Sequence, residues 1–84
     1  MPTAYLFINT EVGSESSVLE ALKEVEGVKE AHTIMGVYDI IASIRADTMD
    51  KLDSIITKSI GRNNEITAKL TVLIKEGMVK GERG

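Results

Sequence analysis

The chain has 84 residues, of which 43% are hydrophobic, 4% are aromatic and 27% are charged. A chain of this length forms one domain at most, and it buries a smaller share of its surface than a larger domain does. With a formal net charge of −3 and scattered Lys and Arg residues, it lacks the strongly basic surface that is typical of nucleic-acid-binding proteins.

Cysteine is absent and His32 is the single histidine. Disulfides, thiolate catalysis, cysteine metal sites and histidine metal clusters are therefore excluded, and no cofactor is expected. The first residues, MPTAYLFINT, lack the charged start and long apolar stretch of a signal peptide. Because no apolar run is long enough to span a bilayer, we expect a soluble, cytoplasmic protein.

The amino-terminal half predicts a strand, a helix and a second strand. Thr3–Thr10 is rich in strand formers. Ser14 fits an N-cap and Gly27 fits the C′ position of a helix. Apolar residues recur between them at three- and four-residue steps, on one helical face: Val18, Ala21, Leu22 and Val25. Val28–Met35 then predicts the second strand, and Gly36 opens a turn.

The carboxyl-terminal half predicts a strand, a helix and a strand. Tyr38–Ala46 predicts the third strand. Asp47 fits the cap of a helix that ends at Gly61, with an apolar stripe of Met49, Leu52, Ile56 and Ile60. Ile66–Glu76 predicts the fourth strand. We therefore expect a domain over residues 1–76 and a flexible tail over residues 77–84, where glycines alternate with charges.

This β-α-β-β-α-β order predicts an α+β, ferredoxin-like fold, in which a four-stranded antiparallel sheet carries both helices on one face. Alternate strand residues point to opposite faces. Each predicted strand holds apolar groups on both sides: Ala4, Leu6 and Ile8 against Tyr5 and Phe7; Ile40, Ala42 and Ile44 against Ile41; Ile66, Ala68, Leu70, Val72 and Ile74 against Thr67, Thr71 and Leu73.

The helices can cover only one of these two faces. Leaving the other face wet would expose a larger apolar patch than a soluble monomer usually tolerates. Apolar burial is worth about 25 cal/mol per Å², so covering such a patch outweighs any single surface ion pair. The sequence therefore predicts a dimer that packs sheet to sheet.

No set of residues indicates catalysis. His32 has no carboxylate and nucleophile arranged around it in the sequence, and we interpret it as structural. Hydroxyls at a helix start cap amides, and we assign three serines to this role: Ser14, Ser16 and Ser17. The glycines match no phosphate-binding fingerprint. Tyr5 and Phe7 resemble the stacked aromatics of an RNA-recognition sheet, but the third strand lacks the matching motif, so we assign both to core packing.

The segment IMGVYDIIA, residues 34–42, places one aspartate at the start of an apolar strand. Gly36 allows a tight turn whose successive N–H groups can bind an anion. With Asp39 beside them, these donors suit a zwitterion: the amides take its carboxylate and Asp39 takes its ammonium group. Alternatively, Asp39 accepts hydrogen bonds from its own hairpin, as Asp often does near turns. The residues alone leave both interpretations open.

The same glycine–any–aromatic–aspartate turn, G-V-Y-D, follows VLEALKEVEGVKEAHTIM and precedes ADTMDKLDSIITKSIG and ITAKLTVLI. In this order the segments resemble the ligand-binding RAM domain of the Lrp/AsnC transcriptional regulators, from about Thr3 to Lys75. The resemblance implies a ligand-binding loop and adjacent lining groups: Gly36, Val37, Tyr38 and Asp39, with Met35, Thr67 and Thr71. For Thr67 and Thr71, a cross-strand hydroxyl pair is an equal alternative.

The resemblance also implies how the protein works and with what. It implies dimers that pair through their sheets, further assembly into octameric or similar rings, and an amino acid or similar small effector between dimers. The helix-turn-helix of the full-length regulators is not found ahead of Thr3, so we expect no direct nucleic-acid binding. Full-length regulators of the same family are candidate partners.

Two other functions stay open on the sequence. A small dimeric ferredoxin-like enzyme would need an aromatic and polar pocket inside one subunit, such as a cleft between sheet and helices. A structural adaptor would assemble without binding any small molecule.

Overall fold

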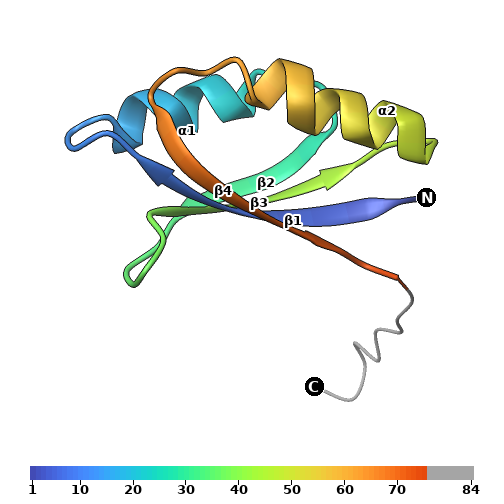
Figure 1. The fold of residues 1–84 in the computed structure, drawn as a ribbon, viewed down its shortest axis with the longest axis horizontal. Coiled ribbons are helices and arrows are strands. Elements are labelled where there is room, and N and C mark those ends of the chain that lie inside the picture. Colours follow the sequence, from blue (N-terminus) through green and yellow to red (C-terminus); the bar gives the residue numbers. More distant parts are fainter. Residues whose placement is uncertain (76–84) are drawn as a thin grey trace.

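A computed structural model describes residues 1–75 of the chain. Their order confirms the ferredoxin-like α+β fold: β1 (Thr3–Thr10), α1 (Glu15–Lys23), β2 (Val28–Thr33), β3 (Ile40–Arg45), α2 (Met49–Ser54), the π-helix η1 (Ile55–Ile60) and β4 (Ile66–Leu73). The helices all lie on one face of the sheet, as predicted (Figure 1). Among the described residues, no helix is both long and apolar enough to cross a membrane.

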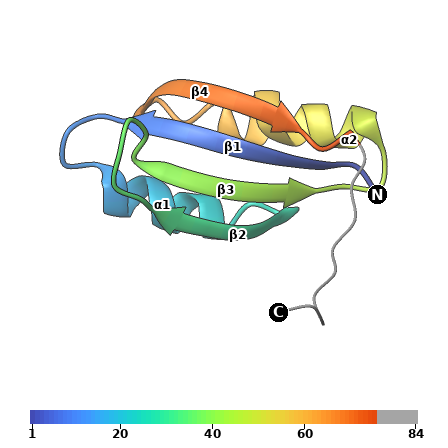
Figure 2. The same cartoon turned by 90° about the horizontal axis from the view of Figure 1, so that it is seen from below.

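The four strands form one antiparallel sheet in the order β2-β3-β1-β4 (Figure 2). The central strand β1 pairs with β3 from Thr3↔Arg45 to Ile8↔Ile40. It also pairs with β4, and a register shift between Asn9 and Thr10 leaves Thr67 without a cross-strand partner. Because of this bulge, Ile66 lies opposite Thr10 and departs from the simple alternation that the sequence predicted for the fourth strand.

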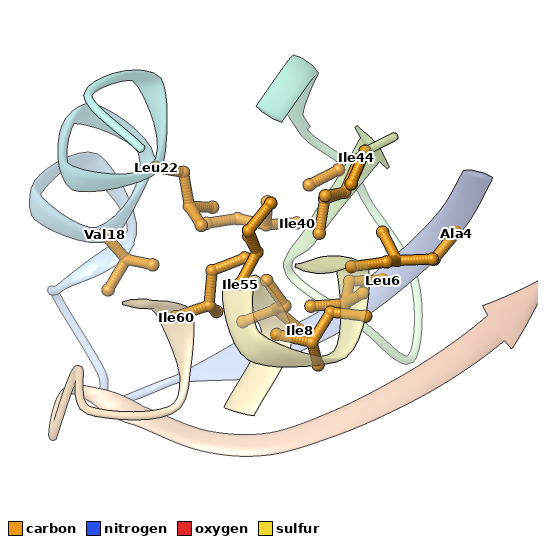
Figure 3. Packing of buried hydrophobic residues seen from close by; sticks show 13 residues of the cluster. Ala4, Leu6, Ile8, Val18, Leu22, Ile40, Ile44, Ile55 and Ile60 are labelled. Atoms are coloured by element: carbon orange, nitrogen blue, oxygen red, sulfur yellow. The ribbon is translucent and has the colours of Figure 1, made fainter. Parts of the chain in front are cut away.

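The core fills the space between the sheet and the helices (Figure 3). From the sheet come the alternate residues of β1 and β3 that the sequence assigned to one side, and from the helices come five large aliphatic groups: Val18, Leu22, Leu52, Ile56 and Ile60. Ile55 joins them. Two predicted members are exposed, Ala21 and Met49, because α1 and α2 each turn a narrower apolar stripe to the sheet than the periodicity suggested.

The ends of both helices differ from the prediction. The C-cap of α1 is Glu24, so Gly27 is not the C′ residue; its φ of 99° instead turns the chain into β2. The N-cap of α2 is Thr48 rather than Asp47, because the Thr48 side chain accepts a hydrogen bond from the Lys51 amide at 3.1 Å.

The second helix does not stay α-helical, although it ends where the sequence predicted. Its last turns form the π-helix η1, closed by a hydrogen bond of 3.0 Å from the Gly61 amide to the Ile56 carbonyl. A Cβ atom on Gly61 would lie 2.3 Å from the Thr57 carbonyl oxygen. Only glycine therefore fits this helix end without a shift of the backbone.

Three strands are shorter than predicted. β2 ends at Thr33 rather than Met35, and β3 begins at Ile40 rather than Tyr38, because the Ile34 amide bonds the Asp39 carbonyl at 2.8 Å and the chain between them leaves the sheet. The end of β3 moves from Ala46 to Arg45, and β4 ends at Leu73 rather than Glu76. Glu76 and the predicted tail lie outside the described residues.

Candidate functional site

The loop between β2 and β3, residues 34–39, projects from the sheet face that carries no helices (Figure 1). The two ends of this loop are tied: the Ile34 amide bonds the Asp39 carbonyl, and the Asp39 amide bonds the Ile8 carbonyl at 2.9 Å. Its tip is bare, with Met35 fully exposed and Val37 85% exposed. The predicted effector loop is therefore a fixed arm with a solvent-facing tip.

The Asp39 side chain settles part of the choice that the sequence left open. Its Oδ2 accepts a hydrogen bond of 2.9 Å from the Thr10 amide. The bond crosses to β1, so the Asp39 side chain, unlike its backbone carbonyl, accepts no hydrogen bond from its own hairpin among the described residues. The last pair between β1 and β3 is Ile8↔Ile40. Beyond this pair the Thr10 amide has no strand carbonyl to bond, and the Asp39 carboxylate accepts its hydrogen bond instead. Asp39 therefore has a structural role at the end of the sheet.

The loop still offers groups to a ligand. Within residues 1–75, no hydrogen bond uses the N–H groups of Met35, Gly36, Val37 or Tyr38. Asp39 is half-buried, and its second oxygen accepts no hydrogen bond from the described residues. Gly36 has open space where a Cβ would stand. Free amide donors and a half-engaged carboxylate thus lie within one short segment, which is the pairing that a zwitterion needs.

Tyr38 anchors the loop to the sheet. Its ring packs on Phe7 of β1, with centroids 5.7 Å apart and planes inclined by 51°, a favourable tilted arrangement for two aromatic rings. Both rings are half-buried. Tyr5, two residues earlier on the same side of β1, is 39% exposed. The assignment of Tyr5 and Phe7 to core packing is therefore wrong within one subunit, because no helix covers their side of the sheet.

Thr67 and Thr71 are not brought together with the loop in one subunit. Thr71 pairs with Leu6, four residues along β1 from Thr10, which corresponds to about 13 Å at the usual rise of a strand. Thr67 lies in the bulge and lines a shallow hollow with Asn63, Ile66 and Lys69, among other residues, none of them from the loop. Neither threonine faces a hydroxyl across the sheet, since Thr71 faces Leu6, so the hydroxyl-pair alternative fails.

The helix-free side of the sheet, called the open face below, is apolar. The register places on it six large apolar side chains: Tyr5, Phe7, Ile41, Leu70, Val72 and Ile74. Four of them are between 39% and 46% exposed. Toward β2 the open face turns polar, where His32 Nε2 lies 3.1 Å from Glu30 Oε1. The apolar part therefore concentrates on β1 and β4.

Strand β4 is unusual because both of its faces are exposed. Every residue of β4 after Ile66 is exposed, including Leu73 on the helix side at 50%. Figure 1 shows β4 running away from the helix layer toward its carboxyl-terminal end. The sequence predicted one uncovered face, and the structure adds an uncovered edge strand, which is a surface that proteins normally cover or pair.

The remaining candidates offer no chemistry in the described residues. His32 is exposed, and its ring nitrogen lies 3.1 Å from the Glu30 carboxylate. The Ser14 side chain does not cap α1; its hydroxyl donates to Glu65 instead, and so does that of Ser17. The cleft between sheet and helices that an enzyme would need is filled by the core. Small hollows lie at the ends of the helices and between them, for example around Val25, Ile55 and Ser59.

The described residues thus combine a ferredoxin-like frame with a loop of unused amide donors, and they hold no catalytic set. The profile of the Lrp/AsnC ligand binding domain family matches residues 3–81. The chain belongs to this family, and it is a regulatory rather than an enzymatic domain. No curated protein sequence shows a significant match to the chain.

Solved structures agree with this assignment. FFRP-DM1 is 37% identical, with a TM-score of 0.84 over 87% of this chain and 97% of its own. The hypothetical protein PHS023 from Pyrococcus horikoshii is 33% identical, with a TM-score of 0.84 over 98% of this chain and 95% of its own. The regulator NMB0573 from Neisseria meningitidis, solved with L-Met, is 6% identical and shares the fold alone, with a TM-score of 0.79 over 93% of this chain and 52% of its own.

Proposed function

We propose that this domain binds an amino acid at the loop of residues 34–39 and responds by changing its assembly. The observation that carries the proposal is the set of unused amide donors beside a carboxylate with one free oxygen. In this arrangement the loop amides bind the ligand carboxylate. The free oxygen of Asp39 binds its ammonium group, and hydrogen bonds to charged groups are the stronger ones.

The open face and strand β4 are the surfaces through which we expect copies of the chain to assemble. Two copies packed through these surfaces would bury Tyr5, Leu70, Val72 and Ile74, which one subunit leaves exposed. A ligand held between such dimers stabilises the larger assembly by mass action, because it binds only the assembled form. An octameric or similar ring is the form that we expect from the family.

The lining of the site would then come from more than one subunit. Met35, at the exposed tip of the loop, reaches outward from its own subunit. Thr67 and Thr71 lie away from the loop in their own subunit, so they would line a site only when they belong to a neighbouring copy. The family profile supports a ligand-binding role, and the regulator NMB0573, which shares the fold, was solved with an amino acid, L-Met.

The effect on transcription would be indirect. The family profile covers the ligand-binding domain of these regulators, and we propose that the protein joins full-length regulators of its family in mixed assemblies. Co-purification with such a regulator, lost in an open-face variant, would support this route.

Isothermal titration calorimetry across the common amino acids tests the ligand. Asp39→Asn is the informative variant, because an amide oxygen can still accept from Thr10 while the negative charge is lost. We expect it to weaken binding about tenfold or more, as for a hydrogen bond to a charged group. Asp47→Asn, at an exposed position outside the loop, is the matched control.

Two results would contradict the proposal. If no amino acid binds the wild type while assembly persists, the domain is an assembly adaptor. If Asp39→Asn binds as tightly as the wild type, the carboxylate does not hold the ammonium group.

A further inference from the structure

The turn between β1 and α1 is fastened by two segments that are distant in sequence. At its start, the Thr10 amide donates to Asp39 Oδ2 at 2.9 Å. One residue later, the Glu11 amide donates to the Glu65 carbonyl at 2.8 Å. Thr10 is 8% exposed, and its hydroxyl donates to the Glu11 carbonyl at 3.1 Å. The effector loop and the segment before β4 therefore meet on two adjacent residues.

Glu65 continues this contact to the first turn of α1. Its Oε1 accepts from the Ser17 hydroxyl at 2.9 Å and its Oε2 from the Ser14 hydroxyl at 3.2 Å. The Glu65 amide is fixed in turn by Asn63 Oδ1 at 2.9 Å. A carboxylate near the amino terminus of a helix is also favoured by the helix dipole. Glu65 thus contacts the first turn of α1, where the N-cap residue Ser14 makes no side-chain capping hydrogen bond.

We propose that these contacts form a polar hub, comprising Asp39, Thr10, Glu11, Glu65 and Ser17, that transmits the state of the effector loop to the first turn of α1. In the hub, Asp39 is shared: one oxygen holds Thr10 and the other is free. An ammonium group bound at the free oxygen pulls the Asp39 carboxylate toward itself. The hydrogen bond from the Thr10 amide to the other oxygen is thereby weakened. The shift passes through Glu11 to Glu65, which acts as a positioning residue.

The consequence is a regulatory connection between the two sides of the sheet. The loop projects from the open face, while α1 lies on the opposite face (Figure 1). A partner that contacts the start of α1 could thereby sense a ligand that it does not touch. The ligand step rests on the proposed function, whereas the hub itself can be tested without any ligand.

Hydrogen exchange of the full chain without ligand, resolved to single amides by NMR, tests the hub. Asp39→Ala removes the acceptor of Thr10, and we expect about fivefold faster exchange at Val18, in the first turn of α1, as for the loss of one buried hydrogen bond. Asp39→Asn keeps the acceptor and should leave this exchange near the wild-type rate. Glu20→Gln, on the exposed face of α1, is the control for a local change of charge.

A double-mutant cycle that combines Asp39→Ala with Glu65→Ala tests whether Glu65 carries the connection. If Glu65 carries the connection, Asp39→Ala adds nothing to the exchange at Val18 once Glu65 is removed. Equal effects of Asp39→Ala with and without Glu65, or no effect of Asp39→Ala at Val18, would overturn the hub. Should Asp39→Ala fail to fold, the same comparison is made with Thr10→Pro, which removes the donor. If the wild type binds no amino acid while Asp39 and Glu65 are still coupled in the exchange at Val18, the proposed ligand is refuted and the hub is supported.

Discussion

Gly27→Ala should destabilise the domain far more than Gly13→Ala, although both glycines have positive φ, 99° and 87°. At Gly27 an added Cβ would lie 2.7 Å from Ile55 Cδ1 and 3.1 Å from the Arg45 carbonyl, whereas at Gly13 it meets nothing within 4 Å. The left-handed backbone costs about 1–2 kcal/mol in each variant. Overpacking adds about 1–3 kcal/mol, at Gly27 alone.

Thermal unfolding by circular dichroism, at one fixed protein concentration, measures the difference. For a domain of this size each kcal/mol corresponds to about 4–8 °C. We therefore expect Gly27→Ala to unfold at least about 5 °C below Gly13→Ala. Equal melting temperatures for the two variants would refute the close packing of the joint between α1 and β2 against η1.

Three further predictions concern other parts of the molecule. Val72→Lys should raise the dimer dissociation constant about tenfold or more, since it places a charge in the apolar open face; Val12→Lys, at a fully exposed position outside the sheet, is the control, and equal association of both by sedimentation would contradict it. Thr48→Ala should lower the free energy of unfolding by about 1 kcal/mol through loss of the α2 cap, whereas Asp47→Ala should not; urea titration distinguishes them. Gly61→Ala should destabilise η1, because the added Cβ would collide with the Thr57 carbonyl oxygen. Faster amide exchange in the second helix would show this, whereas unchanged exchange would show that the backbone shifts to admit the Cβ without loss of stability.

Much of the fold follows from local patterns in the sequence. The alternation in β1 and β3 predicts which residues are buried, because each strand has a helix-covered side and a full set of neighbours. β4 is different: it lies at the edge of the sheet and is exposed on both faces, so its alternation carries no burial signal. The π-helix and the bulge at Thr67 also escape the patterns, since both depend on tertiary packing rather than on periodicity.

The turn of the loop was predictable from the sequence, but its attachments were not. The G-V-Y-D turn points to residues 36–39 from the sequence alone. The bond from Thr10 to Asp39 spans 29 positions, and the bond from Ser17 to Glu65 spans 48. Neither pair has a local signature, because any carboxylate and any donor could meet across such a distance. Only the strand order brings them together.

The proposed assembly depends most on one surface, the apolar open face with its exposed edge strand. Sedimentation velocity of the wild-type chain at micromolar concentration, with and without an amino acid that binds, tests it directly. We predict a dimer or larger species alone and a shift to larger assemblies with the ligand. A stable monomer under both conditions would contradict the account.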